Sequence, residues 1–275
     1  MRVVLLGTGT PASNPRRSGP ATAILVDGRA FIVDAGPGVV RRASGAAYLG
    51  HGALSPPEFS RLFITHLHSD HTAGYPDIIL SPAVTGRIRA LQVYGPKGLT
   101  RMTDHLLAAY REDLAIRVVD KTASEKIGYQ VQAREIEPGV IHREENIEVR
   151  AFKVDHGLWQ HALGYRFESR GSVIVVSGDT RPSANTIKAC DGCDVLVHEV
   201  YCKAGFDQRS PSRQPYHAAH HTSTHELADL ARQARPKLLV LSHLLFFGCS
   251  EEQLLGEVTS RYDGAVALGN DLDQY

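Results

Sequence analysis

The segment FITHLHSDHTAGYP, residues 63–76, places three histidines and one aspartate within six positions, directly after a short apolar run. Residues two apart at the end of a strand point the same way, so His66 and His68 can face a single metal ion. Asp70 and His71 follow where the chain turns towards a helix, and their diverging side chains suit a second ion nearby. Because neutral imidazole and carboxylate are ligands that zinc favours, the pattern predicts a metal site rather than a solvated polar loop.

Two metal ions need more than four ligands, so further histidines or aspartates are expected at other strand ends. Three such residues occur, each directly after an apolar or alternating stretch: His156, Asp179 and His243. A single histidine in such a place is more often structural. Together with the first four residues, these three predict a dinuclear site.

The remaining pattern predicts one layered α/β domain over residues 1–275, because strands dominate both halves, helices lie between them, and no linker or repeat interrupts the chain. Residues 116–155 are strand-like as a whole, and a polar, histidine-rich loop is expected up to about residue 222. The other expected strands cover residues 2–6, 21–26, 30–33, 61–65, 91–94, 162–167, 172–177, 194–198 and 237–242. The expected helices cover residues 39–47, 102–110 and 224–233.

Lys plus Arg and Asp plus Glu both number 30, so the net charge is zero and gives no general attraction to nucleic acid or an anionic membrane. No apolar stretch approaches the roughly 20 residues that span a bilayer, and the apolar start is too short for a secretory signal. The sequence therefore predicts a cytoplasmic protein that does not bind membranes.

The four cysteines do not form a disulfide framework in a chain of this size, so buried or free thiols are expected. Cys190-x-x-Cys193 could be half of a zinc knuckle, but no second pair completes it. The cysteines are Cys190, Cys193, Cys202 and Cys249.

The order of the candidate ligands along the chain resembles that of the metallo-β-lactamase superfamily. The residues that carry the resemblance are Asp34, His66, His68, Asp70, His71, His156, Asp179 and His243. The resemblance implies a four-layer αββα sandwich with a dinuclear site at one edge of the two sheets. It implies one ion held by His66, His68 and His156 and another held by Asp70, His71 and His243. Asp179 would bridge the two ions, and Asp34 would support the site without ligating.

Several stretches are similar to ribonuclease Z and its arylsulfatase-like relatives. They are LGTGTP (6–11), VDAGPGVVRR (33–42), GPKGL (95–99), DHGLWQHALGYRF (155–167), SGDTR (177–181), HEVY (198–201) and HTSTHELA (221–228). In that family pattern a histidine oriented by a glutamate protonates the leaving oxygen, and His221 and Glu199 occupy those positions here. Carboxylate–imidazole pairing raises the pKa of the imidazole and fixes its tautomer, as a general acid requires. The expected catalytic residues are thus His221, Glu199 and the ligand Asp70.

Two zinc ions, two aspartates and one bridging hydroxide give a cluster charge of about +1, which suits an anionic substrate. Metal-bound hydroxide, formed because the ions lower the pKa of water to about 7, would attack the ester. Zinc is favoured because flavodiiron-type members carry a carboxylate where this chain has His68; Mn²⁺ or Fe²⁺ are the alternatives. The prediction is a zinc-dependent hydrolase of phosphodiesters or related anionic esters.

One departure from ribonuclease Z concerns its long Gly/Pro-rich basic arm, which grips tRNA. Residues 100–155 contain no such arm, and their basic residues are matched by acids. A small anionic ester is therefore the favoured substrate and RNA the less favoured one. A tRNA 3′-processing endonuclease, an arylsulfatase, a lactonase and a non-catalytic metal- or signal-binding protein remain alternatives, and a homodimer is left open.

Overall fold

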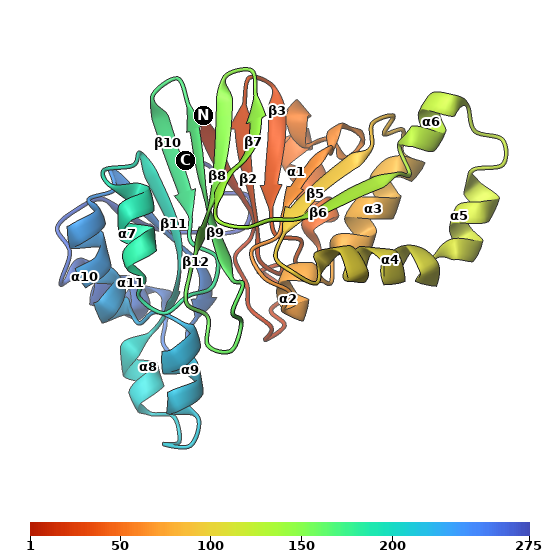
Figure 1. Ribbon diagram of the computed structural model, residues 1–275. Coiled ribbons are helices and arrows are strands. Elements are labelled where there is room, and N and C mark those ends of the chain that lie inside the picture. The colour runs from red at the N-terminus through yellow and green to blue at the C-terminus, as the bar shows by residue number, and fades with distance from the viewer. The chain divides into compact units, whose positions relative to one another are not determined.

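The computed structural model describes all 275 residues and divides them into two compact units, each built around one sheet (Figure 1). Unit 1 consists of Met1–Gly7, Ser13–Ile136 and Asp271–Tyr275. Unit 2 consists of Thr8–Ala12 and Glu137–Asn270. Two mixed sheets flanked by helices confirm the predicted α/β class.

Unit 1 contains a six-stranded sheet in the order β1-β2-β3-β4-β5-β6. The first three strands pair antiparallel through tight turns, and β3 to β6 run parallel. The Asp27-Gly28 turn joins β2 to β3, and both of its residues have the positive φ that a two-residue hairpin turn requires. The strands are β1 (Arg2–Gly7), β2 (Ala21–Val26), β3 (Arg29–Val33), β4 (Arg61–Phe63), β5 (Leu91–Gly95) and β6 (Val131–Glu135).

Helices α1 and α3 pack on this sheet and complete the core of unit 1. The buried face of α1 is formed by Val39, Val40, Ala43 and Ala46, at helical spacing, and it belongs to one apolar cluster with strand residues such as Ile32. The helices of unit 1 are α1 (Val39–Tyr48), α2 (Ser69–Thr72), α3 (Tyr75–Val84), α4 (Leu99–Ala109), α5 (Arg111–Arg117) and α6 (Ala123–Ile127). Short 3₁₀ turns cover Gly52–Leu54 and Pro56–Glu58.

Unit 2 contains a seven-stranded sheet in the order β13-β12-β11-β10-β9-β8-β7. Strands β10 to β13 run parallel, and β7 to β10 form an antiparallel meander. The strand β11 is buried along its whole length, as expected for a central parallel strand. The strands are β7 (Gly139–Glu144), β8 (Ile147–Lys153), β9 (Leu163–Ser169), β10 (Ser172–Val176), β11 (Val195–Tyr201), β12 (Leu238–Leu245) and β13 (Val266–Leu268).

Helices α7, α10 and α11 lie beside β10 to β13, and their apolar faces share one buried cluster with β11 and β12 (Figure 1). Leu227 and Ala231 of α10 pack with Leu196 and Leu239 of the sheet in that cluster. The helices of unit 2 are α7 (Ala184–Cys190), α8 (Lys203–Asp207), α9 (Gln214–His220), α10 (Thr224–Ala234) and α11 (Glu251–Thr259).

Two secondary-structure predictions are wrong. The strand-like interval 116–155 begins instead with the end of α5 and with α6, none of whose side chains is buried, and α5 and α6 project from the rest of unit 1 (Figure 1). The capping box formed by Thr122 and Glu125 starts α6. The expected polar loop up to residue 222 is also wrong, because residues 203–207 and 214–220 form α8 and α9.

The expectation of buried or free thiols is met only in part, because Cys190, Cys193 and Cys202 are buried but no cysteine is a free thiol in the structure. Cys190 pairs with Cys193, and Cys202 pairs with Cys249, so all four cysteines are in disulfides. Because both sulfurs of Cys190 and Cys193 are in this disulfide, they cannot act as thiolate ligands of a zinc knuckle. No helix combines the length and apolar character needed to cross a bilayer.

Candidate metal centre

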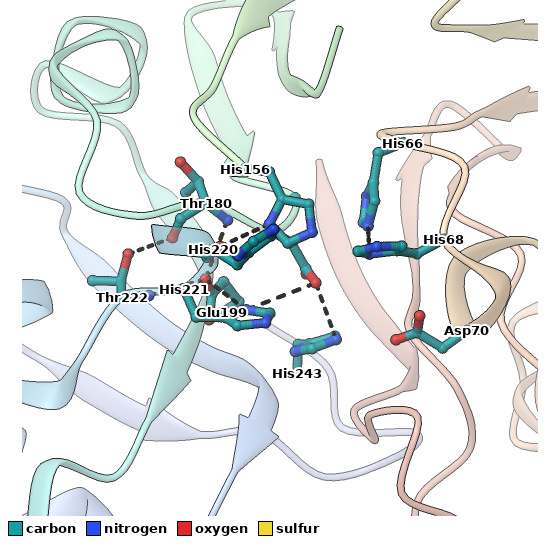
Figure 2. Close-up of polar contacts among 12 residues, drawn as sticks. His66, His68, Asp70, His156, Thr180, Glu199, His220, His221, Thr222 and His243 are labelled. Carbon is teal, nitrogen blue, oxygen red and sulfur yellow. Dashed lines mark hydrogen bonds and ion pairs between the residues drawn. The ribbon is translucent and has the colours of Figure 1, made fainter. Parts of the chain in front are cut away.

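In unit 1, the residues after β4 bring two imidazoles together. His66 Nε2 lies 3.0 Å from His68 Nδ1, and His66 is completely buried (Figure 2). Thr65 Oγ1 lies 3.0 Å from the other nitrogen of His66 and fixes the orientation of that ring. The alternation expected at a strand end therefore does place these two side chains on one side.

Asp34 follows β3 with a φ of 63° and is buried beside this loop. Its Oδ1 accepts the backbone N–H of Thr65 at 2.8 Å, and its Oδ2 accepts the Thr65 hydroxyl at 2.9 Å. The same Oδ2 lies 2.8 Å from His71 Nδ1. Since His71 Nδ1 is thereby occupied, its Nε2 is the nitrogen left for a metal ion, which is how carboxylates commonly hold ligating histidines.

Helix α2 carries Asp70 and His71 at its N-terminal end. Asp70 Oδ2 lies 3.6 Å from His71 Nε2, and both side chains are buried. The His71 ring lies 4.2 Å from the ring of His66, measured between centroids. Unit 1 thus gathers the four residues of the opening motif around Asp34.

In unit 2, a β-bulge in β12 orients His243. Glu199 pairs with Ser242 and Val200 pairs with Leu244, so His243 is an extra residue in the ladder, with a φ of 45°. Its Nε2 lies 3.3 Å from Oδ2 of Asp179, a residue that follows β10. The bulge therefore directs the imidazole towards the carboxylate.

His156 lies just after β8 and is tied to helix α9. Its Nδ1 donates to the backbone carbonyl of His220 at 2.7 Å, so Nε2 is the nitrogen that would bind a metal. A Cβ on Gly157 would lie 2.0 Å from His220 Nε2, so only glycine allows this close approach. The C-terminal end of α9 therefore sets the orientation of His156.

Glu199, on β11, is held next to His221. Its Oε1 accepts the backbone N–H groups of Thr180 and Thr222, each at 3.1 Å. His221 Nδ1 lies 3.3 Å from the same oxygen and 3.9 Å from Asp179 Oδ2 (Figure 2). The imidazole is therefore nearer to the glutamate than to the aspartate.

Burial raises the pKa of the Glu199 carboxyl well above its usual range, and the negative charge of Asp179 adds to this effect. A carboxylate with a high proton affinity is a strong acceptor for an imidazole N–H. The arrangement is chemically suited to hold a proton between Glu199 and His221 and to fix the tautomer of the imidazole.

The donor atoms fit a metal ion within each unit. In a tetrahedral zinc site two ligand nitrogens lie about 3.4 Å apart, given Zn–N distances near 2 Å. The His66–His68 pair at 3.0 Å and the Asp179–His243 pair at 3.3 Å match this spacing. Asp179, His221 and His243 also offer ligand atoms that lie within 4.8 Å of one another, so His221 is close enough to be a ligand itself.

Residues 29–244 match the family model described as "Beta-lactamase superfamily domain". The chain therefore belongs to the metallo-β-lactamase superfamily and is a metal-dependent hydrolase.

Its more specific similarity is to proteins named ribonuclease Z. One from Mycobacterium marinum is 31% identical over 277 residues, covering 99% of this chain and 97% of the relative. Another, from Mycobacterium sp. strain KMS, is 32% identical over 279 residues, covering 99% and 94%. The predicted relationship to ribonuclease Z is confirmed.

Two solved structures match the whole chain. The metallo-beta-lactamase fold protein YhfI from Bacillus subtilis has a TM-score of 0.74 at 16% identity and covers 100% of this chain and 98% of that one. Human tRNase Z, short form, has a TM-score of 0.70 at 20% identity, with the same coverage. These matches confirm the predicted metallo-β-lactamase fold.

Four supporting residues were missed in the sequence. Thr65 holds Asp34, Thr180 and Thr222 hold Glu199, and the carbonyl of His220 holds His156. Each lies within three positions of a predicted site residue, and this proximity is the one signal that could have indicated them.

Proposed function

We propose that this protein hydrolyses phosphodiester bonds in RNA with two zinc ions. The end-to-end similarity to proteins named ribonuclease Z supports RNA as the substrate class. The main structural support for hydrolysis of esters with poor leaving groups is the buried pair formed by His221 and Glu199, whose Nδ1 and Oε1 atoms lie 3.3 Å apart. A lactonase would share the metal ligands but would not need that pair.

The metal ligands are proposed from their order along the sequence and from family membership. His66, His68 and His156 hold one ion, and Asp70, His71 and His243 hold the other. Asp179 bridges the two ions, and Asp34 orients His71 without ligating. Residues 1–275 are proposed to act as a single hydrolase domain.

When bound, the two ions would polarise the phosphoryl group and lower the pKa of a water molecule for attack. Residues of the chain itself would protonate the leaving group. Glu199 fixes a proton on His221 Nδ1, so the second imidazole nitrogen can deliver a proton to the departing oxygen. Asp70 is proposed to act in catalysis as well as in ligation.

A small anionic ester is the second candidate substrate. It is favoured by the segment 100–127, whose five basic residues are balanced by five acidic ones. Without a basic surface on this projecting segment, little affinity for a long RNA comes from counterion release. Sulfate esters and lactones are weaker candidates on the same site.

The location is proposed to be cytoplasmic, where thiols are kept reduced. The two disulfides would then form only on oxidation. Alkylating free thiols at the moment of lysis tests this location. Four alkylated cysteines per chain would support the cytoplasm, whereas a chain without any alkylated cysteine would indicate an oxidising compartment.

A substrate panel tests the proposed function. Zinc-loaded protein is assayed on a pre-tRNA, bis-p-nitrophenyl phosphate, p-nitrophenyl sulfate and a lactone, with Asp70→Asn as the control for metal-dependent activity. We expect the two phosphodiesters to be hydrolysed with the highest kcat/KM and both activities to fall with Asp70→Asn. Preference for the sulfate or the lactone would contradict the proposal.

A further inference from the structure

The helical hairpin α8–α9 joins β11 to α10 in unit 2 and carries an excess of positive charge (Figure 1). Residues 203–221 contain three basic side chains, Lys203, Arg209 and Arg213, and one acid, Asp207. Lys203 Nζ lies 2.5 Å from Asp207 Oδ1, so those two charges compensate each other. The two arginines leave this hairpin positive in a chain whose net charge is zero.

The Phe247 ring supports two side chains of this hairpin. The guanidinium carbon of Arg209 lies 4.3 Å from the centroid of that ring, and the His217 ring lies 4.8 Å from it. Phe247 is itself fixed by close backbone packing, because a Cβ on Gly205 would lie 2.6 Å from its carbonyl oxygen. Tight backbone packing therefore fixes the position of Phe247, which does not lie in a loose surface loop.

Both supported side chains have an enclosed nitrogen with no hydrogen-bond partner: Nε of Arg209 and Nδ1 of His217. An enclosed polar nitrogen without a partner costs stability unless a ligand supplies one. A phosphate oxygen is the kind of acceptor that these nitrogens lack, and the planar arginine fork suits phosphate in particular.

His217 lies near the proposed proton donor, His221. The His217 and His221 rings are 6.0 Å apart, measured between centroids. Burial, together with the positive charge of Arg209, lowers the pKa of His217 to about 4. His217 is therefore neutral near pH 7, and the local positive charge comes from the arginines.

We propose that Arg209 and His217 form a subsite for a second phosphate group of the substrate, one nucleotide along from the scissile bond. This inference rests on the proposed function and narrows its substrate class to chains with at least two phosphates. Tyr216, which is 51% exposed and stacks on His220 at 4.1 Å, offers a face for the intervening base.

Equilibrium binding tests the subsite without relying on turnover. The zinc-loaded protein is titrated by calorimetry with adenosine 3′,5′-bisphosphate and with adenosine 5′-monophosphate, and the ratio of the two Kd values is compared. We expect the bisphosphate to bind roughly 10-fold or more tightly, in line with one charge-assisted phosphate contact. Arg209→Gln should reduce this ratio to below about 3-fold, and His217→Asn should reduce it less.

Arg143→Gln is the matched control, because that arginine already pairs with Glu148 at 2.8 Å and should leave the ratio unchanged. Unfolding midpoints of all variants show whether the fold is kept. The proposal of a subsite would be overturned if the wild type did not prefer the bisphosphate, or if the ratio of the two Kd values were unchanged in Arg209→Gln. If the ratio behaves as expected but RNA is not cleaved, the subsite stands and the proposed function fails.

Discussion

At the residue scale, the candidate chemistry depends on how Glu199 and His221 are held. Two backbone N–H groups fix one carboxylate oxygen of Glu199, and His221 approaches that same oxygen. Glu199 lies in β11 and His221 ends α9, so the pair depends on the path of the chain between them. Their pairing could be expected from family resemblance but not from their spacing of 22 positions.

Replacing His221 tests its proposed role as general acid. His221→Ala should keep its metal and its fold but lose roughly 10²–10⁴-fold in turnover on esters with poor, alkoxide-like leaving groups. Esters of p-nitrophenol should be affected far less, because that leaving group departs without protonation. Glu199→Gln should show the same selectivity in milder form.

The measurement is turnover across esters of graded leaving-group pKa, with zinc content checked in parallel. An equal loss on every ester, or a loss of zinc from His221→Ala, would show instead that His221 is a ligand or a structural residue. The second outcome is physically reasonable, since His221 lies near Asp179 and His243.

The buried His198 predicts a pH dependence of stability. Burial lowers the pKa of His198 to about 4, whereas in the unfolded chain it is near 6.5. The unfolded chain therefore binds more protons than the folded chain between pH 6.5 and pH 4. The neutral His198 contributes about 3 kcal/mol to the free energy of unfolding above this window, and that contribution is lost as the pH falls from 6.5 to 4.

His198→Asn removes this titration but can keep a donor for the carbonyl of Glu199, which His198 Nδ1 contacts at 2.7 Å. We expect the variant's free energy of unfolding to fall less steeply than that of the wild type between pH 6.5 and pH 4. Urea unfolding at several pH values, without metal, measures both curves. Parallel curves would contradict the prediction.

At the element scale, strands and amphipathic helices with regular apolar spacing were predictable, whereas irregular elements were not. The predicted strands over residues 21–26 and 91–94 match β2 and β5, and the predicted helix over residues 224–233 matches α10. The bulge that turns His243 leaves no pattern in the apolar strand β12. Helices α8 and α9 are short and rich in polar residues, so their sequence resembles a loop.

The contact between Gly157 and α9 gives a prediction at this scale. Gly157 has a φ of 54°, and a side chain there would displace His220, whose carbonyl holds His156. Gly157→Ala should therefore weaken metal binding by roughly 10–100-fold, the usual cost of disturbing a partner of a ligand. It should also lower the free energy of unfolding by more than the 1–2 kcal/mol that a positive φ alone costs.

Gly171→Ala is the matched control, since Gly171 has a φ of 80° but open space at its Cβ. In Gly171→Ala the free energy of unfolding should fall only by the cost of the positive φ, and the metal affinity should stay unchanged. Zinc titrations and chemical unfolding of both variants measure the difference. Equal metal affinity in the two variants would show that the position of His220 does not matter to His156.

At the scale of the whole molecule, charge balance limits how the protein holds a nucleic acid. The net charge is zero, and the projecting segment with α5 and α6 has no excess of basic residues. The α8–α9 hairpin carries a local excess of positive charge, because its one acid, Asp207, pairs with Lys203 and leaves Arg209 and Arg213 uncompensated within the hairpin. Composition gives the overall balance, whereas the fold shows which of the hairpin's charges compensate each other.

Binding to RNA should therefore be weak and only mildly sensitive to salt. Two phosphate contacts predict a slope of log K against log salt concentration of about −1.4 for a single strand. Fluorescence anisotropy with a labelled single-stranded RNA at several salt concentrations measures it. A slope of about −4 or steeper would show that a larger basic surface takes part.

The central claim is that two metal ions share Asp179, and metal stoichiometry tests it most directly. Elemental analysis of the wild type, Asp179→Ala and the control Asp229→Ala, whose aspartate is an exposed partner of Arg232, gives metal content per chain. We expect about two ions in the wild type and in the control, and a loss of most of both ions in Asp179→Ala. Full metal content in Asp179→Ala would contradict the account.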